Sequence, residues 1–600
     1  MGRYRFALVA SAAIGALAWT TPGIARADDP KAVIEGVEDE DLRDRIARAV
    51  GETERPPQTR FQARRRATDA AEDVISVLRS EGYYAYTVEP DVSEADPPTP
   101  VVRVTPGPRF KIVAPAVEWL DPPATGDAQT AARKAMELAE GEPGRAADVI
   151  AAEGRIVAAL STRGYADAKA GERRVVVDHA DSTVRPTYRI DSGDLVRLNG
   201  IELQTEGRTN RRWLQGLAPW KDGEVYDPED VAELERRLLD TNVYSTVTVA
   251  LSPPESTNAQ GRRPVIVSLA DRPRRTLEAG VGWSTSEGFG LDALVTWYNR
   301  FGRADTLQTE LRLAQIESRL GVELQLPHWR RPARTLTLGA EVFNEDTPAY
   351  DRLGALLRAD LRQRVGKTSF FTYGASLEAS RNEELVLDPI TAARIPVERE
   401  LVILTGIAGL SLDRSDDPLD PRRGWRVNAE AQPTAIAGDD NLYFLRAQAQ
   451  GTIYVPLQDD AKTVAAGRLR LGSVLGGSIP EVPTARRFFS GGGGSVRGYE
   501  YQGIGPRLPD GTPQGGLSLV ESTLEVRHRF TERWGGVAFL EGGAVGEEQY
   551  PDFGDIRLAA GVGVRFHLPF GPVRADVAVP LNPDEGQPAF QVYISIGQAF

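Results

Sequence analysis

The stretch Arg486-Arg487-Phe488-Phe489-Ser490-Gly491-Gly492-Gly493-Gly494-Ser495-Val496-Arg497-Gly498-Tyr499-Glu500 decides how the rest of the sequence is interpreted. Four consecutive glycines cannot pack a helix face or hold the interior of a strand, so these residues form a loop. Regular apolar periodicity is missing over residues 476–516, which makes the loop far longer than the usual connection of ~2–6 residues. Its aromatic pairs argue against disorder, because disordered segments contain few aromatic residues. We therefore predict an ordered loop with a function, against the alternative of an inert surface loop.

The first residues predict export. Arg3 and Arg5 precede an apolar stretch from Phe6 to Trp19, and Ala25-Arg26-Ala27 has the form of a signal-peptide cleavage site. We predict a cleaved signal peptide over residues 1–27; a retained anchor is the alternative, although a membrane-spanning helix needs ~20 apolar residues. No later run approaches 18 apolar residues, and the chain contains no cysteine. These features leave a periplasmic protein or an outer-membrane β-barrel.

A pattern with a period of about 80 residues recurs in the front half of the chain. In each copy a helical pattern runs into a short turn with an aromatic residue, at Gly82-Tyr83, Gly164-Tyr165 and Asn242-Val243-Tyr244, and then into strands. The order is β-α-α-β-β, which predicts three small α+β modules at residues 28–109, 110–192 and 193–274. The exposed edge of such a sheet can bind an extended polypeptide through its main chain. The alternative is that the modules are inert spacers.

From residue 275 to residue 600 the apolar period changes to two. Leu320, Val322, Leu324 and Leu326 alternate with polar or small residues, and the same holds from Ile556 to Leu568. We count sixteen candidate strands, with short connections after even-numbered strands and generally longer ones after odd-numbered strands. An even number of strands with this asymmetry is typical of a closed outer-membrane barrel of antiparallel strands. A soluble two-layer β-domain is the alternative.

Three motifs, together with the repeat, carry a resemblance to a known family. Ser495-Val496-Arg497-Gly498-Tyr499 resembles the (V/I)RG(Y/F) signature of the sixth extracellular loop in the superfamily of outer-membrane insertases and two-partner secretion transporters. Phe539-Leu540-Glu541-Gly542-Gly543 resembles its F-x-D-x-G partner motif on the thirteenth strand, with Glu in place of Asp. A characteristic turn after the eighth strand is matched by residues 413–424, with Asp413, Arg414, Asp416, Asp417, Pro418, Pro421 and Gly424. The modules resemble polypeptide-transport-associated (POTRA) domains, and three of them resemble the TamA family of translocation and assembly module subunits.

The resemblance implies a latch between the loop and the barrel wall. Arg497 offers a planar fork suited to a carboxylate, and alternation places Phe539, Glu541 and Gly543 on one face of their strand. An Arg497–Glu541 pair is the predicted latch, with the rest of the loop signature around it: Val496, Gly498 and Tyr499. Two unrelated charges in a wet lumen are the alternative.

The first and last strands suggest a second device. Gly280 and Gly282 in the first strand and Gly597 in the last leave few side chains at the seam where the barrel closes. We predict a lateral gate there, against the alternative that small residues suit tight curvature. The final residues resemble the terminal signal by which barrels are recognised for insertion, with Ile594, Ile596 and Phe600 in the last strand.

Other chemistry finds little support in the sequence. Gly366-Lys367-Thr368 lacks the first glycine of a phosphate loop, and the four histidines show no metal spacing. The aspartates of residues 413–420 do not have calcium-loop spacing, so turn formation is the better interpretation. We therefore predict no enzyme, no cofactor and no metal site. A net charge of −14 with interspersed signs speaks against a nucleic-acid partner.

The predicted function follows from the resemblance. It implies an outer-membrane protein of a Gram-negative bacterium, with the modules in the periplasm, that promotes folding and insertion of β-barrel proteins and autotransporters. The implied partners are the outer-membrane bilayer, unfolded clients and a TamB-like protein anchored in the inner membrane, with lipid transport as a possible joint role. The alternatives are a two-partner secretion pore for an exoprotein and a passive porin.

Overall fold

The computed structural model describes residues 29–53, 56–120, 122–285, 287–366, 368–387, 394–439, 441–568, 571–584 and 586–596. The predicted signal peptide (residues 1–27) and, in the last strand, Gly597 and Phe600 lie outside the described residues, as does the side chain of Ile596. The chain forms two compact units. The first comprises residues 1–197, 223–228 and 258–262, and the second comprises residues 198–222, 229–257 and 263–600.

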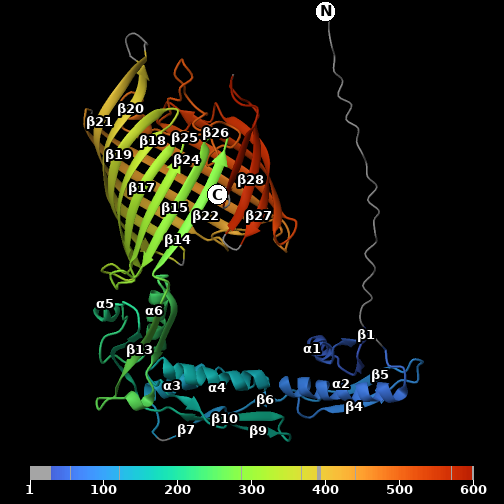
Figure 1. Cartoon of the computed structure of the whole chain (residues 1–600). Helices are drawn as coiled ribbons and strands as arrows, with labels where there is room; N and C mark the ends of the chain where they lie inside the picture. The colour runs from blue at the N-terminus through green and yellow to red at the C-terminus, as the bar shows by residue number, and fades with distance from the viewer. Residues whose placement is uncertain are drawn as a thin grey trace, which may run out of the picture. The chain divides into compact units, whose positions relative to one another are not determined.

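The first unit contains two α+β groups (Figure 1). In the first group, β2 (Val33–Glu35) runs parallel to β5 (Pro100–Thr105), and β4 (Thr87–Val92) pairs with the other edge of β5. Helices α1 (Glu40–Val50) and α2 (Arg60–Ser80) come between β2 and β4 in the chain and bury Ile46, Val74 and Leu78 in the core. A short pair, β1 (Asp29–Pro30) with β3 (Glu52–Thr53), completes this group.

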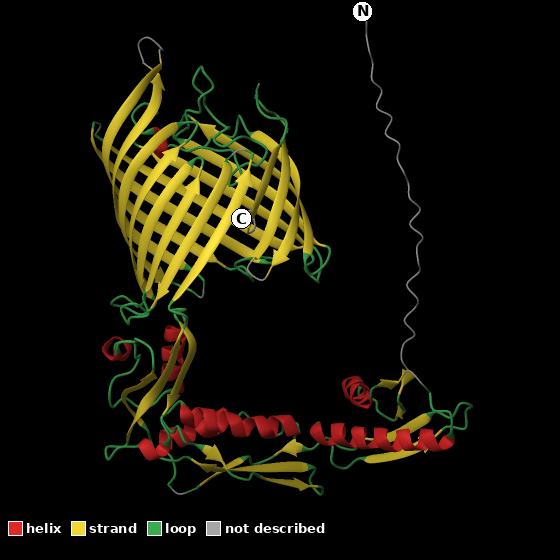
Figure 2. Cartoon of the chain, viewed as in Figure 1, coloured by secondary structure: helices red, strands yellow, loops and turns green. Residues whose placement is uncertain are grey.

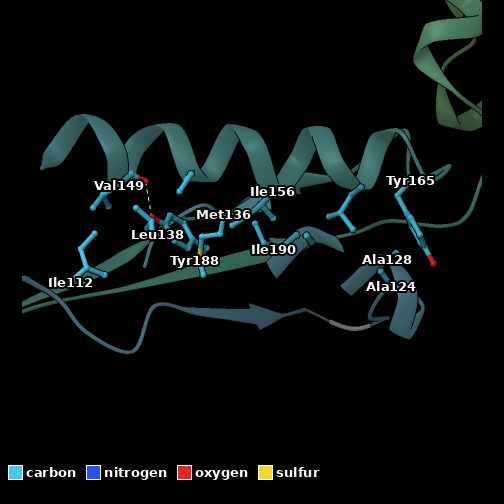
Figure 3. Close-up of a cluster of buried hydrophobic side chains, with 13 residues drawn as sticks. Ile112, Ala124, Ala128, Met136, Leu138, Val149, Ile156, Tyr165, Tyr188 and Ile190 are labelled. Atoms are coloured by element: carbon cyan, nitrogen blue, oxygen red, sulfur yellow. Dashed lines mark hydrogen bonds between the residues drawn. The ribbon is translucent and has the colours of Figure 1, made fainter. Parts of the chain in front are cut away.

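The second group has β10 (Thr183–Asp191) at the centre of its sheet. Its other strands are β6 (Lys111–Ile112), β7 (Ala116–Trp119), β8 (Lys169–Ala170) and β9 (Arg174–Asp178), and its helices are α3 (Gly126–Ala135) and α4 (Ala146–Ser161). Figure 3 shows the core, in which apolar residues of both helices meet Ile190 and Tyr188 of β10. The buried hydroxyl of Tyr188 donates to the carbonyl of Val149 at 2.8 Å, so the only polar atom of that side chain is satisfied.

The second unit begins with a third α+β group. Its sheet has the order β11-β13-β12, with β11 (Arg197–Thr205), β12 (Tyr244–Leu251) and β13 (Arg262–Asp271). Helices α5 (Arg211–Gln215) and α6 (Pro228–Leu239) lie between β11 and β12 in the chain, and the short helix η1 (Pro254–Ser256) follows β12. The β-α-α-β-β order predicted from the repeat is present, whereas the boundaries at residues 109, 192 and 274 remain predictions. Within the described residues, none of the helices is long and apolar enough to cross a bilayer.

Sixteen antiparallel strands close into one barrel, as predicted (Figure 2). They are β14 (Arg275–Ser284), β15 (Gly288–Tyr298), β16 (Thr306–Ala314), β17 (Glu317–Leu326), β18 (Arg334–Asp346), β19 (Tyr350–Arg364), β20 (Phe370–Leu387), β21 (Arg394–Asp413), β22 (Gly424–Gly438), β23 (Leu442–Pro456), β24 (Thr463–Leu475), β25 (Ser518–Arg529), β26 (Trp534–Gly546), β27 (Arg557–Leu568), β28 (Gly571–Pro580) and β29 (Gln591–Ile596).

Alternation sorts the side chains of the barrel wall into two faces. On β27, Val562 and Val564 are 62% and 49% exposed, whereas Arg565 is buried. Leu320 and Val322 of β17 are likewise exposed. An apolar outer face and a polar inner face are what a bilayer around the barrel requires. The eleventh strand, β24, is followed by residues 476–517, which contain a single short helix, η2 (Thr484–Arg486).

Candidate functional site

The long loop after β24 is anchored at its stem to the inner face of β20 and β21. The backbone N–H of Thr484 donates to a carboxylate oxygen of Glu384 at 2.7 Å, and Arg399 holds the other oxygen of Glu384 at 2.9 Å. Arg486 of the loop pairs with Glu378. Because Glu378 and Glu384 are each at most 5% exposed, these bonds are made away from water, where ion pairs are stronger.

The glycine run turns the loop toward the opposite wall. Gly491 and Gly492 have φ values of 105° and 100°, in the region that favours glycine. Ser490 Oγ donates to Glu521 Oε1 of β25 at 2.9 Å, and the Ser495 hydroxyl binds the same oxygen. A buried carboxylate with two hydroxyl donors is a fixed anchor for both ends of the glycine run.

Arg497 sits at the centre of the site with its side chain 1% exposed. Its Nε and Nη2 donate to Glu541 Oε1 at 3.0 and 2.6 Å, and its own backbone N–H donates to Glu541 Oε2 at 2.6 Å. Nη2 also contacts Glu525 at 2.5 Å, and Nη1 contacts Asp576 at 2.9 Å. The guanidinium lies 3.5 Å from the ring centre of Phe539, a cation–π distance. One arginine thus joins β25, β26 and β28.

Other arginines balance the three carboxylates around Arg497. Arg527 Nε binds Glu525 at 2.9 Å, Arg565 pairs with Asp576, and Arg574 lies 3.8 Å from Asp576. The cluster therefore holds four guanidinium groups and three carboxylates, all largely removed from water. Burying unpaired charge is costly, so the groups depend on one another and on Arg497 for their compensation.

The residues flanking Arg497 fit the wall closely. Val496 packs at Gly543, where a Cβ would come 2.7 Å from Val496 Cγ2 and from Ser490 Oγ. Gly498 has φ 103°, and a Cβ there would lie 3.0 Å from that of Ala559. Tyr499 is buried, and its hydroxyl donates to the Leu558 carbonyl at 3.1 Å. The small residues on the wall and in the loop therefore allow the loop backbone to approach the wall closely.

All seven predicted latch residues come together in this site: Val496, Arg497, Gly498, Tyr499, Phe539, Glu541 and Gly543. Their role as a latch stays a proposal. The sequence did not point to Glu525, Asp576 or Tyr593, whose hydroxyl accepts the N–H of Gly498 at 3.1 Å. One signal was available for Glu525, because the charged residues at 521, 525 and 527 share one face of the strand, whereas Val520, Leu524 and Val526 lie on the other, which marks the charged face as the inner one.

Four of the predicted gate residues belong to the two strands that close the barrel: Gly280 and Gly282 of β14, and Ile594 and Ile596 of β29. Within the described residues, β14 and β29 share two register pairs, Trp283 with Ile594 and Ser284 with Tyr593, whereas β14 shares ten with β15. Thr285 extends the contact by one backbone hydrogen bond, from its N–H to Val592 O at 3.2 Å. Over the described residues, the stretch of β14 that contains Gly280 and Gly282 has no register partner on β29.

The predicted turn motif forms the connection from β21 to β22. A carboxylate oxygen of Asp416 accepts the backbone N–H groups of Asp417, Arg422 and Arg423 at 2.9–3.1 Å. Gly424 has φ 100°, and a Cβ there would lie 2.1 Å from the carbonyl oxygen of Arg414. Asp413 binds Ser415, and Asp417 caps Leu419; Pro418 is exposed and Pro421 is buried. These side-chain hydrogen bonds to the backbone stabilise the turn. Within the described part of the chain, no cluster of His, Asp or Glu could hold a metal ion.

Comparisons with known proteins place the barrel in a family. The model of the Omp85 superfamily domain matches residues 299–600. The outer membrane protein assembly factor BamA of Neorickettsia risticii is 26% identical over 451 residues, which cover 70% of this chain and 57% of that protein. BamA of Nitratidesulfovibrio vulgaris is 25% identical over 453 residues, covering 73% of this chain and 55% of that protein. The chain spans about half the length of the curated relatives it matches.

A solved structure shares the fold. The crystal structure of BamA from Haemophilus ducreyi lacking POTRA domains 1–3 superposes with a TM-score of 0.67 at 18% identity. The match covers 82% of this chain and 100% of that chain. It shows that the barrel and the α+β elements before it follow a known architecture.

Proposed function

Since the chain belongs to the Omp85 superfamily, we propose that it assembles β-barrel proteins into the outer membrane through the seam between β14 and β29. Its closed barrel lies in the outer membrane, and the α+β groups that precede the barrel lie in the periplasm. The relatives described above are named assembly factors, which supports assembly rather than a chemical reaction as the activity.

The observation that carries the proposal is the short pairing between β14 and β29 over the described residues, which end at Ile596. Two register pairs join these strands there, whereas β14 has ten with β15 and β28 has six with β29. Unpaired N–H and C=O groups in a bilayer cost several kcal/mol each, so an incoming strand that pairs with them is strongly favoured. An open edge of β14 would template such a strand by main-chain hydrogen bonding.

Finer assignments rest on the number of modules. Three modules resemble the TamA family, and we propose on that basis a TamB-like partner that binds the modules, autotransporters among the clients and a share in lipid transport. The exposed edge strands of the α+β groups, such as β4 and β9, are suited to bind extended chains.

A disulfide across the seam tests the gate. The chain has no cysteine, so the pair Trp283→Cys with Ile594→Cys forms the only possible bridge and joins directly paired residues of β14 and β29. The matched control, Trp283→Cys with Phe289→Cys, joins β14 to β15 and leaves the seam free. We expect vesicles holding the seam-locked protein to lose client insertion and to regain it on reduction, while the control stays active.

Two results would contradict the proposal. Full insertion activity with a locked seam would exclude a gate between β14 and β29. A steady ionic conductance through the resting barrel would favour a porin or a secretion pore, because the loop described above contacts the inner face of the wall at both β20 and β28 and so crosses the lumen.

A further inference from the structure

The glycine-rich loop contacts both sides of the barrel seam, which the latch at Arg497 does not explain. On the side of the first strand, Glu287 in the turn between β14 and β15 accepts the backbone N–H of Gly493 at 2.8 Å through Oε1. On the side of the last strand, the hydroxyl of Tyr593 accepts the N–H of Gly498 at 3.1 Å and donates to the carbonyl of Tyr499 at 3.3 Å. One loop segment of seven residues, 493–499, therefore reaches the two strands that close the barrel.

These contacts lie where the seam itself is paired. Tyr593 is one of the two β29 residues in register with β14, and its partner is Ser284. Ser284 Oγ in turn accepts the backbone N–H of Glu287 at 2.9 Å, which fixes the turn that carries the carboxylate. Because β14 and β29 share two register pairs over the described residues, the three hydrogen bonds from the loop are a substantial addition to the contacts that join the two edges there.

The fit of the loop at this point is tight. A Cβ on Gly493 would come 3.0 Å from Tyr593 Cδ1 and 3.3 Å from Glu287 Oε1, so this glycine lies between the two seam residues. The next residue, Gly494, has no atom within 4 Å of the same position. Neither glycine has a positive φ, so the difference between them is one of space alone.

We propose that the inserted loop is a staple across the seam, with Glu287 and Tyr593 as positioning residues that hold its two ends. Opening the seam then requires the loop to release at least one side, so the docked loop keeps the resting barrel closed. This inference rests on the proposed function, because it gives the loop a role in the opening of the same seam.

Amide hydrogen exchange in the client-free, full mature chain in bilayers tests the staple. The N–H groups of Thr285 and Val592 bond across the seam, to Val592 O at 3.2 Å and to Thr285 Oγ1 at 3.1 Å. Their exchange rates report the open population even when that population is small. We expect Glu287→Ala and Tyr593→Phe each to raise these rates about five- to tenfold. This is the factor expected when one hydrogen bond of typical net strength is lost. Amides between β14 and β15 should exchange at native rates.

Two matched controls separate the staple from general loosening of the loop. Gly493→Ala should accelerate seam exchange and Gly494→Ala should not. Arg507→Ala removes hydrogen bonds to the carbonyls of Gly503 and Gly511, which lie outside residues 493–499, and should also leave seam exchange unchanged. Unchanged rates in both Glu287→Ala and Tyr593→Phe would overturn the staple, as would equal acceleration by Gly494→Ala or Arg507→Ala.

The exchange and disulfide experiments together distinguish failure of the staple from failure of the gate. Accelerated exchange in the staple variants together with an active seam-locked barrel would retain the staple and remove the gate. Native exchange in those variants together with an inactive seam-locked barrel would retain the gate and overturn the staple.

Discussion

Replacing Arg497 by alanine should release the loop while leaving the barrel wall intact. The substitution removes the partner of three carboxylates that are at most 2% exposed, and it removes the cation above Phe539. Breaking a buried ion pair by deleting one member costs about 3–5 kcal/mol. At 1.36 kcal/mol per tenfold change, the ratio of docked to undocked loop falls by a factor of roughly 100 to 5,000. We expect the barrel to stay closed, because the backbone hydrogen bonds between its strands do not involve this side chain.

Trypsin cleavage of the folded protein in bilayers measures the docked population. Arg487 is 5% exposed and its guanidinium donates to carbonyls of the loop, so a docked loop resists cleavage there. When opening is fast relative to cleavage, the cleavage rate follows the undocked fraction. In the Arg497→Ala variant we expect cleavage after Arg487 to be faster by up to the factor by which the docked population falls. Client insertion should be impaired. The heat-dependent gel shift of the barrel should stay native, because the wall is still closed.

The control is an arginine of the same loop that has no carboxylate partner among the residues that the structure describes. Arg507 donates to the carbonyls of Gly503 and Gly511 at 2.7 and 2.6 Å, so Arg507→Ala should change cleavage after Arg487 by less than tenfold, as expected for about 1 kcal/mol. A loop that stays protease-resistant and fully active without Arg497 would refute the latch. Equal acceleration in both variants would show that the carboxylate cluster contributes nothing specific.

Three further predictions concern other residues. Gly498→Ala, which combines φ 103° with a Cβ 3.0 Å from that of Ala559, should favour the undocked loop by about 1–3 kcal/mol in the same cleavage assay. Asp416→Ala should speed amide exchange over residues 417–423, because three N–H groups lose their acceptor, whereas Asp416→Asn keeps an acceptor oxygen and should stay close to native. Burial lowers the pKa of His328, in the turn between β17 and β18, where its Nδ1 accepts the N–H of Ala333 and its Nε2 lies 2.9 Å from the Arg237 carbonyl of α6. Since the folded-state pKa lies below the ordinary value of about 6.5, this stabilisation is complete above that pH and is lost as the pH falls toward the folded value. Corrected amide exchange of Ala333 should therefore accelerate on acidification in the native protein and stay independent of pH in His328→Gln.

Much of the architecture could be predicted from the sequence, because the alternation of apolar and polar residues along a strand is visible within a few neighbouring positions. The two-residue period of β17 and β27 indicates which side chains face lipid, and the sixteen strands closed as the count predicted. The helix-turn-strand repeat similarly predicted three α+β groups. Gly498 and Gly424, which the motifs singled out, both have a positive φ, the backbone region that favours glycine.

The site was only partly predictable because it depends on strand register and on distant contacts. Glu525 meets Arg497 because β25 pairs with β26 so that Glu525 lies opposite Phe539. Asp576 belongs to β28, two strands further along the wall from β26. Glu541, where aspartate is usual in the family motif, reaches both the guanidinium and the backbone N–H of Arg497. Such pairings join residues tens of positions apart, and composition or periodicity does not reveal them.

The position of these partners along the chain has a consequence for biogenesis. Among the described residues, the three carboxylates that bind Arg497 all come after it in the chain, on β25, β26 and β28, and Tyr593 comes from the final strand. The complete set of contacts around Arg497 and Gly498 therefore forms only after the last five strands of the barrel are in place. A barrel truncated before residue 576 would retain Arg497 with an incomplete set of counter-charges. Its loop would then stay undocked and accessible to proteases.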